Sequence, residues 1–181
     1  MSRSALSLAL AATVAATAAN AQTVVRDGSE IAFTTRQMGV PVDGRFTQWQ
    51  AQMRFDPKNP ATGSVSFTID TGSASFGASE TDAEVKKPEW FYVVKFPRAS
   101  FTSTGIQATG PGRYAVAGQL TIKGKAQPLT VPVQLAGDTA SGSFAIKRLA
   151  FDIGSGDWAD TSMVADEVQV RFKLKLAGLP K

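Results

Sequence analysis

Residues 167–176 read Glu-Val-Gln-Val-Arg-Phe-Lys-Leu-Lys-Leu, in which every second side chain is apolar. Successive side chains of an extended strand point to opposite faces, so this period of two gathers the apolar side chains on one face. Three basic residues, Arg171, Lys173 and Lys175, lie on the other face. The run therefore predicts a β-strand with one buried and one solvated face.

The same alternation recurs through most of the preceding chain. It predicts further strands around residues 31–33, 49–55, 65–69, 101–106, 114–122, 129–135 and 144–153. The turn Lys123-Gly124-Lys125 is expected to join two of these strands as a hairpin. The phase slips by one residue between Ile146 and Leu149, which predicts a β-bulge at Lys147-Arg148.

One helix is expected between the third and fourth strands. Thr81-Asp82-Ala83-Glu84 fits a capping box, in which the first and last side chains satisfy free backbone N–H groups at a helix start. Val85 can face inward, and Pro88 is expected to end the element.

The chain of 181 residues contains neither His nor Cys. This excludes disulfides, Cys nucleophiles, Ser-His-Asp triads and the metal or haem sites that depend on these ligands. We therefore expect no cofactor, no metal and no catalytic residue, and favour a binding function. The 19 basic and 15 acidic residues are dispersed along the chain, without the clustered basic and aromatic face of a nucleic-acid-binding protein.

The first 21 residues predict a cleaved signal peptide. Arg3 supplies a positive start, residues 5–18 form an Ala- and Leu-rich run, and Ala19-Asn20-Ala21 fits the small-x-small cleavage pattern. The apolar run is shorter than the roughly 20 residues that a membrane-spanning helix needs. We expect cleavage after Ala21, one folded domain over residues 22–181, and a periplasmic or secreted protein that does not span a membrane.

About eight antiparallel strands can form a sandwich, a soluble barrel or an outer-membrane barrel. In an outer-membrane barrel, Arg171, Lys173 and Lys175 would crowd a narrow lumen without matching carboxylates. The chain's three Trp and two Tyr are also too few for two aromatic girdles. We therefore predict an all-β fold, an antiparallel eight-stranded barrel with an apolar interior and one or two short helices.

Several short segments occur in a characteristic order, namely Ser29-Glu30-Ile31-Ala32-Phe33, Val42-Asp43-Gly44-Arg45-Phe46 with Trp49, Phe55-Asp56-Pro57, Thr81-Asp82, Trp90-Phe91, Phe96-Pro97, Phe101-Thr102-Ser103, residues 118–124, residues 142–148 and Phe151-Asp152-Ile153-Gly154. In order and spacing they resemble the YceI-like family, whose members are exported lipocalin-like barrels. Characterised members of that family bind polyisoprenoid lipids. The resemblance implies a lipocalin-like barrel with a long-chain isoprenoid or similar amphiphilic lipid as its ligand. Tyr92 stands where the family often has an acidic residue, which leaves the lipid head group open.

The apolar positions of each predicted strand give the side chains that we expect to face this ligand. For each of them, packing in the core is the alternative role. They are Phe33, Trp49, Met53, Phe67, Ile69, Tyr114, Val116, Leu120, Val131, Val133, Phe144, Ile146, Val168, Val170 and Phe172. The Tyr114 hydroxyl is expected to donate either to a ligand head group or to a backbone carbonyl.

Three further aromatic residues, Phe76, Phe91 and Trp158, lie in or beside segments outside the expected strands. They are expected to gate the barrel mouth or to fill the core. Arg148, at the predicted bulge, is expected either to bind a phosphate or carbonyl of the ligand or to form a salt bridge with Asp152 or Asp157.

These expectations describe a non-enzymatic carrier that sequesters an isoprenoid or similar amphiphile, such as an isoprenoid quinone. Two alternatives stay open. A barrel with a filled core would be a protein-interaction or stress-response module, and a polar cluster deep in the pocket would indicate a lipid-modifying enzyme. Head group, tail length, delivery partner and the formation of a homodimer are left open.

Overall fold

A computed structural model describes residues 22–180. Within that range the strands form one antiparallel sheet of ten strands in the order β3-β4-β6-β7-β8-β9-β10-β1-β2-β5. The strands are β1 (Thr23–Gln37), β2 (Val40–Phe46), β3 (Trp49–Arg54), β4 (Ser64–Asp70), β5 (Ala74–Ser75), β6 (Arg98–Gly110), β7 (Arg113–Ile122), β8 (Lys125–Ala136), β9 (Thr139–Lys147) and β10 (Glu167–Ala177). The helices are α1 (Ser79–Glu84) and the 3-10 turns η1 (Pro60–Thr62), η2 (Thr71–Ser73), η3 (Arg148–Phe151) and η4 (Gly156–Ala159).

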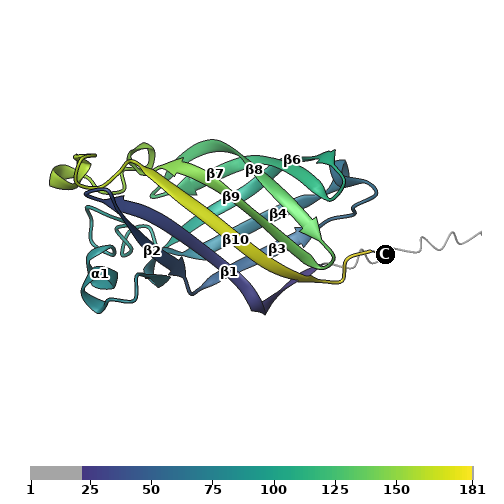
Figure 1. Ribbon diagram of the computed structural model, residues 1–181, viewed down its shortest axis with the longest axis horizontal. Helices are drawn as coiled ribbons and strands as arrows, with labels where there is room; N and C mark the ends of the chain where they lie inside the picture. The colour runs from purple at the N-terminus through teal and green to yellow at the C-terminus, as the bar shows by residue number, and fades with distance from the viewer. Residues whose placement is uncertain (1–21, 181) are drawn as a thin grey trace, which may run out of the picture.

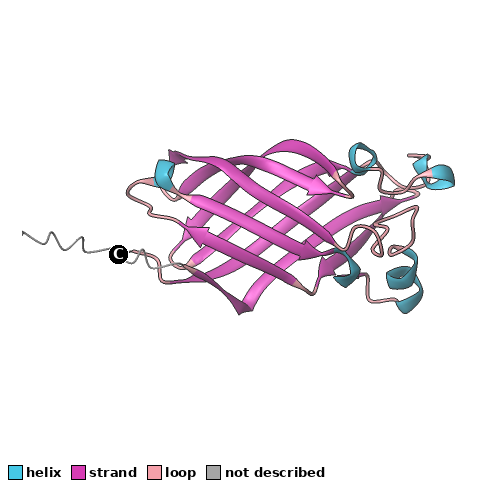
Figure 2. Cartoon of the chain, turned by 180° about the vertical axis from the view of Figure 1, so that it is seen from behind, coloured by secondary structure: helices cyan, strands magenta, loops and turns pink. Residues whose placement is uncertain are grey.

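The sheet curls into an elongated barrel, with α1 and the segment between β9 and β10 at one end (Figures 1 and 2). The start of β1 meets β3 through Gln22, the residue before β1, which forms an isolated bridge with Met53 of β3. The Gln22 side-chain oxygen also accepts a hydrogen bond from the backbone N–H of Phe55 at 2.6 Å. Beside this contact, the Arg26 guanidinium donates to the backbone oxygen of Trp49 at 2.6 Å. These bonds hold the start of β1 against β3.

The alternation of side chains confirms the predicted faces. In β7, Tyr114, Val116, Leu120 and Ile122 are buried, whereas Gln119 is exposed. In β10, Leu174 and Leu176 are buried and the basic residues between and before them are exposed. The all-β fold with an apolar interior is therefore confirmed, and burial of this apolar set is the main stabilising contribution.

Ten strands replace the predicted eight. β5 has only two residues, and β2 was missed because its inward positions, which include Val42 and Phe46, do not all carry apolar side chains. Gly44 occupies one of these positions, opposite Phe33 in the register of β1 and β2. A Cβ on Gly44 would lie 2.4 Å from the Phe33 ring, so the ring covers a place where a side chain would otherwise lie.

Two local predictions are wrong. The predicted β-bulge at Lys147-Arg148 is absent. The apolar alternation changes phase there because β9 ends at Lys147 and η3 begins at Arg148, so the chain leaves the sheet. The helix begins at Ser79, with Ala78 as its N-cap residue, so Thr81 cannot start a capping box. The helix ends at Glu84, before Pro88, and Val85 is buried as expected.

Among residues 22–180, no helix has the length and apolar character needed to cross a membrane. The predicted signal peptide lies outside the described residues.

Candidate ligand-binding cavities

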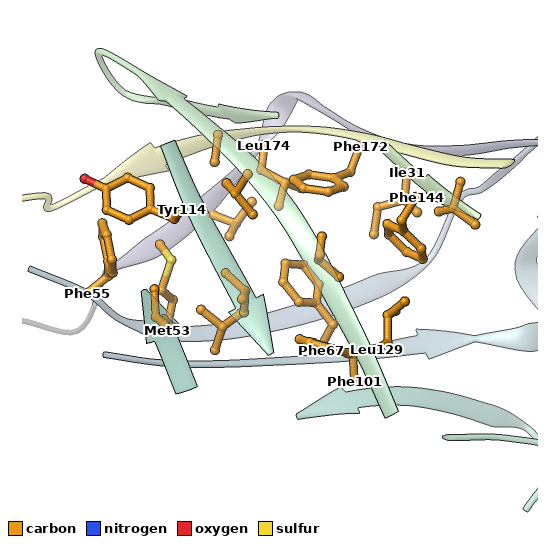
Figure 3. Close-up of a pocket in the computed structure, with 18 of the residues that line it drawn as sticks. Ile31, Met53, Phe55, Phe67, Phe101, Tyr114, Leu129, Phe144, Phe172 and Leu174 are labelled. Atoms are coloured by element: carbon orange, nitrogen blue, oxygen red, sulfur yellow. The ribbon is translucent and has the colours of Figure 1, made fainter. Parts of the chain in front are cut away.

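The barrel encloses an elongated cavity of about 150 Å³, called the inner cavity here (Figure 3). Its lining is apolar apart from the side chains of Ser100 and Tyr114. Side chains from opposite parts of the sheet converge on it, among them Phe67, Phe101 and Phe172 (Figure 3). The inner cavity therefore suits hydrocarbon and offers almost no hydrogen-bonding partners.

A second cavity of about 500 Å³, called the α1 chamber, lies at the end of the barrel where α1 packs. Its volume falls in the range of roughly 300–1,000 Å³ that small-molecule sites occupy. It shares Ile31, Ile69, Leu120, Phe144 and Val170 with the inner cavity, so the two spaces abut. Together they form a site with a narrow apolar part and a wider, more polar part.

Strand β7 shows how the two spaces follow one another. Tyr114 and Val116 line only the inner cavity, Leu120 lines both spaces, and Ile122 lines only the α1 chamber. At a rise of about 3.3 Å per residue, the distance along the strand from Tyr114 to Ile122 is roughly 26 Å. An extended chain molecule is the shape that such a site accommodates.

The structure brings all the predicted inward and gating residues except Trp49 to one or both spaces. The inner cavity takes Met53, Phe67, Ile69, Tyr114, Val116, Leu120, Val131, Val133, Phe144, Val170 and Phe172. The α1 chamber takes Phe33, Ile69, Phe76, Phe91, Leu120, Phe144, Ile146, Arg148, Trp158, Val168 and Val170. Trp49 is buried outside both, with its ring 4.6 Å from the Arg26 guanidinium carbon and beside Phe67. Trp49 therefore has the alternative role, core packing, in the cluster that also contains Ile31 and Leu174.

At the end of the inner cavity remote from α1, Phe55 and Tyr114 form an edge-to-face pair with ring centroids 5.0 Å apart. The Tyr114 hydroxyl points away from the middle of the cavity (Figure 3). Of the two partners expected for this hydroxyl, a ligand head group and a backbone carbonyl, a head group would have to lie at this end of the cavity. Phe55 also lines a second depression, together with Gln22 and Leu179.

Aromatic pairs surround the α1 chamber. Phe33 contacts Phe76 edge to face at 5.2 Å, and Phe46 contacts Phe91 at 6.1 Å. Phe76, Phe91 and Trp158 all come from segments outside the long strands, as the sequence indicated. They lie where side chains can control access to the chamber.

Arg148 has a role that neither sequence expectation described. Its side chain is only 2% exposed, and burial lowers the pKa of its guanidinium. Its Nε, Nη1 and Nη2 groups donate to five backbone oxygens, those of Ile153, Gly154, Trp158, Val164 and Ala165. These bonds account for all five N–H donors of a guanidinium.

Both roles expected for Arg148 are therefore wrong. Its donors are occupied by the loop between β9 and β10, so none is left for a ligand phosphate or carbonyl. The predicted salt bridge is absent too: among residues 22–180 no ion pair joins Arg148 to Asp152 or Asp157, and the carboxylate of Asp152 pairs with Lys125 at 2.7 Å. Arg148 fixes the part of the chain that forms one wall of the chamber.

The polar lining of the α1 chamber was not predicted. It includes Thr35, Gln37, Glu80, Thr81 and Glu84. Thr35 lies on the inward face of β1, and its position in the alternation after Ile31 and Phe33 is the one signal that marked it. The residues from α1 carried no such signal, because the approach of a helix to a barrel end depends on tertiary packing. Among the described residues there is no group of three or more acidic side chains suited to a metal ion.

Residues 22–176 match the family model described as the YceI-like domain. Among solved structures, BcnA of Burkholderia cenocepacia is 42% identical, with a TM-score of 0.80 over 86% of this chain and 99% of that chain. A YceI protein of Campylobacter jejuni is 20% identical, with a TM-score of 0.69 over 77% of this chain and 86% of that chain.

A polyisoprenoid binding domain from Saccharophagus degradans is 15% identical, with a TM-score of 0.63 over 88% of this chain and 98% of that chain. A UPF0312 protein of Yersinia enterocolitica is 37% identical over 94 residues, which are 52% of this chain and 48% of the relative. The match thus spans about half the length of the curated relatives, whereas the structural matches extend over most of both chains.

Proposed function

The chain belongs to the YceI-like family, and from that membership and its cavities we propose that it binds one long-chain isoprenoid or similar amphiphile inside the barrel. The observation that carries the proposal is the pair of abutting cavities, one narrow and apolar and the other wide and partly polar. The likeness in fold to a polyisoprenoid binding domain supports the ligand class. An isoprenoid quinone is one example of such a ligand.

The tail lies in the inner cavity and the head group in the α1 chamber. This orientation follows from the lining, because Ser100 and Tyr114 are the only polar side chains among the described residues that line the inner cavity. Each buried methylene contributes about 0.8 kcal/mol, so a tail of roughly 40 carbons has a gross transfer term on the order of 30 kcal/mol. Practical affinities reach only about 18–21 kcal/mol, so ordering the tail and leaving the membrane must offset much of that term. The inner cavity therefore discriminates between tails by their length and shape.

We assign the protein a carrier role without bond-making chemistry, in the periplasm or outside the cell. The apolar lining of the inner cavity favours binding over catalysis. Export rests on the predicted signal peptide, and N-terminal sequencing of the exported protein is expected to begin at Gln22. A first residue before Gln22 would contradict cleavage after Ala21.

Titration of delipidated protein with a polyprenyl compound of graded tail length tests the binding proposal. We expect one molecule per chain, with affinity rising with tail length until the inner cavity is filled. Binding that is absent at every length, in protein shown by circular dichroism to be folded, would exclude the carrier function and favour an interaction module.

A further inference from the structure

Two polar atoms in the wall of the α1 chamber lack hydrogen-bond partners. They are the Thr35 hydroxyl oxygen Oγ1 and the indole nitrogen Nε1 of Trp90, and both atoms are buried. Both residues line the α1 chamber, and Thr35 is only 8% exposed. Buried polar atoms in proteins are nearly always hydrogen-bonded, so an unpartnered pair in one cavity points to a partner that the cavity receives.

The two residues come from distant parts of the sequence. Thr35 lies near the end of β1, next to the bridge between Gln37 and Val164, and Trp90 lies in the segment after α1. The Trp90 ring packs against Trp158 with centroids 5.3 Å apart, which fixes the indole in the chamber wall. The end of β1 and the segment after α1 both lie at the same end of the barrel (Figure 1).

The chemistry of the two atoms defines what can bind there. An indole N–H only donates hydrogen bonds, and a Thr hydroxyl can donate as well as accept. A head group with acceptor oxygens can satisfy both groups. A carbonyl or hydroxyl oxygen meets this requirement.

The charges in the lining distinguish between neutral and anionic head groups. Glu80 and Glu84 line the α1 chamber, and Arg148 is the basic residue among its described lining residues. The donors of Arg148 are already bonded to backbone oxygens. A phosphate or carboxylate would therefore meet Glu80 and Glu84, of which Glu84 is paired with Lys87, and no free cation among the described lining residues.

We propose that Thr35 and Trp90 form the head-group site of the α1 chamber, and that this site takes an uncharged head group with an acceptor oxygen. The proposal rests on the lipid-binding function above. It assigns the ligand class to prenyl alcohols, quinones or similar neutral compounds, and excludes prenyl phosphates and free fatty acids as preferred ligands.

The test compares two conservative variants, Thr35→Val and Trp90→Phe, with the delipidated wild-type chain. Thr35→Val keeps the shape of the side chain and removes the hydroxyl, whereas Trp90→Phe keeps a smaller aromatic ring and removes the N–H. Three compounds with the same prenyl tail serve as probes, namely an alcohol, a monophosphate and the hydrocarbon without oxygen. Thr34→Val is the matched control, since the Thr34 hydroxyl already bonds to Asp43 outside the chamber.

We expect wild type to bind the alcohol more tightly than the phosphate. Each variant loses about tenfold in affinity for the alcohol and none for the hydrocarbon, because one hydrogen bond is lost. Ligand-free Thr35→Val keeps or raises the melting temperature, since the hydroxyl that it removes has no partner among the described residues. Trp90→Phe lowers it, because the smaller ring packs less against Trp158. Thr34→Val leaves all three affinities unchanged.

Equal alcohol binding by wild type and both variants would overturn the head-group site, as would a preference for the phosphate. If wild type binds the hydrocarbon and alcohol equally, the head-group site fails while the binding function stands. Failure of wild type to bind any of the three probes would overturn the binding function itself.

Discussion

The guanidinium of Arg148 joins residues 153–165 to the end of β9 through backbone oxygens alone. Removing it leaves several buried oxygens without donors, and each unsatisfied group costs about 1–3 kcal/mol. We expect Arg148→Met to lower the free energy of unfolding by at least roughly 3 kcal/mol in urea denaturation.

Arg171→Met is the control for this prediction. Arg171 is exposed and its pairing with Asp43 is a surface ion pair, so a change below about 1 kcal/mol is expected. Similar losses for the two variants would show that the carbonyl contacts of Arg148 do not stabilise the loop.

Asp160 gives the loop between β9 and β10 a dependence on pH. The hydroxyl and backbone N–H of Ser162 both donate to Oδ1 of Asp160, at 2.7 and 2.8 Å. These bonds lower the pKa of Asp160 from its ordinary value of 3.8. A lowered pKa in the folded state means that the carboxylate contributes stability above pH 3.8, and that this contribution is lost as the pH falls through the lowered pKa.

We therefore expect Asp160→Asn to be less stable than wild type at neutral pH, with the difference shrinking below pH 3.8. Urea denaturation of both proteins across this range measures the difference, and subtraction removes the contributions of the other carboxylates. A difference that is constant or grows on acidification would contradict the assignment.

At the scale of the element, β9 depends on the close approach of its backbone to neighbouring strands. A Cβ on Gly142 would lie 2.2 Å from the backbone oxygen of Pro132 and 2.7 Å from the Phe172 ring. Gly142→Ala is expected to destabilise the protein by about 1–3 kcal/mol, because the strands must shift to admit the methyl group. Thermal and urea denaturation measure the loss.

Gly105 provides the comparison for Gly142, since a Cβ there meets nothing within 4 Å. Gly105→Ala is expected to be neutral or to stabilise by up to about 1 kcal/mol through the unfolded chain. If both substitutions have the same effect, steric approach is not the reason for glycine at position 142.

The elements that sequence analysis predicted well are those with a long run of apolar side chains on their inward face, even where a glycine such as Gly118 of β7 interrupts the run. In β7 and β10 the apolar period of two is complete enough to reveal the buried face. In β2 the ring of Phe33 from β1 covers the inward position Gly44, and in so short a strand this one gap leaves only Val42 and Phe46 to mark the inward face. The phase slip before Leu149 was correctly located, but a phase change alone cannot distinguish a bulge from the end of a strand.

At the scale of the whole molecule, the side chains that line the cavities were predictable from strand phase, and the division of the interior was not. The α1 chamber depends on where α1 and the segment carrying Trp90 pack against the barrel. Those contacts join segments that are far apart in the sequence, so they produce no repeating pattern of apolar residues that sequence analysis could detect. The role of Arg148 was hidden for the same reason, since its partners are backbone oxygens, which no residue type identifies.

Whole-molecule function is tested by placing a charge inside the barrel. Val131 is 7% exposed and lines the inner cavity, so Val131→Asp introduces an unpaired carboxylate among apolar side chains. We expect loss of lipid binding and a lower melting temperature. Thr130→Asp, at the adjacent exposed position of β8, is expected to bind lipid like wild type. Equal lipid binding by both variants would show that the inner cavity is not the ligand site.

The central claim is that the interior of this barrel holds a lipid in the cell. Native mass spectrometry of the chain exported by its own host and purified without detergent or organic solvent measures this directly, and organic extraction identifies the bound compound. We predict one long-chain isoprenoid or similar amphiphile per polypeptide, with an uncharged head group. A folded protein that carries nothing and takes up no quinone, polyprenyl phosphate or fatty acid analogue would contradict the account.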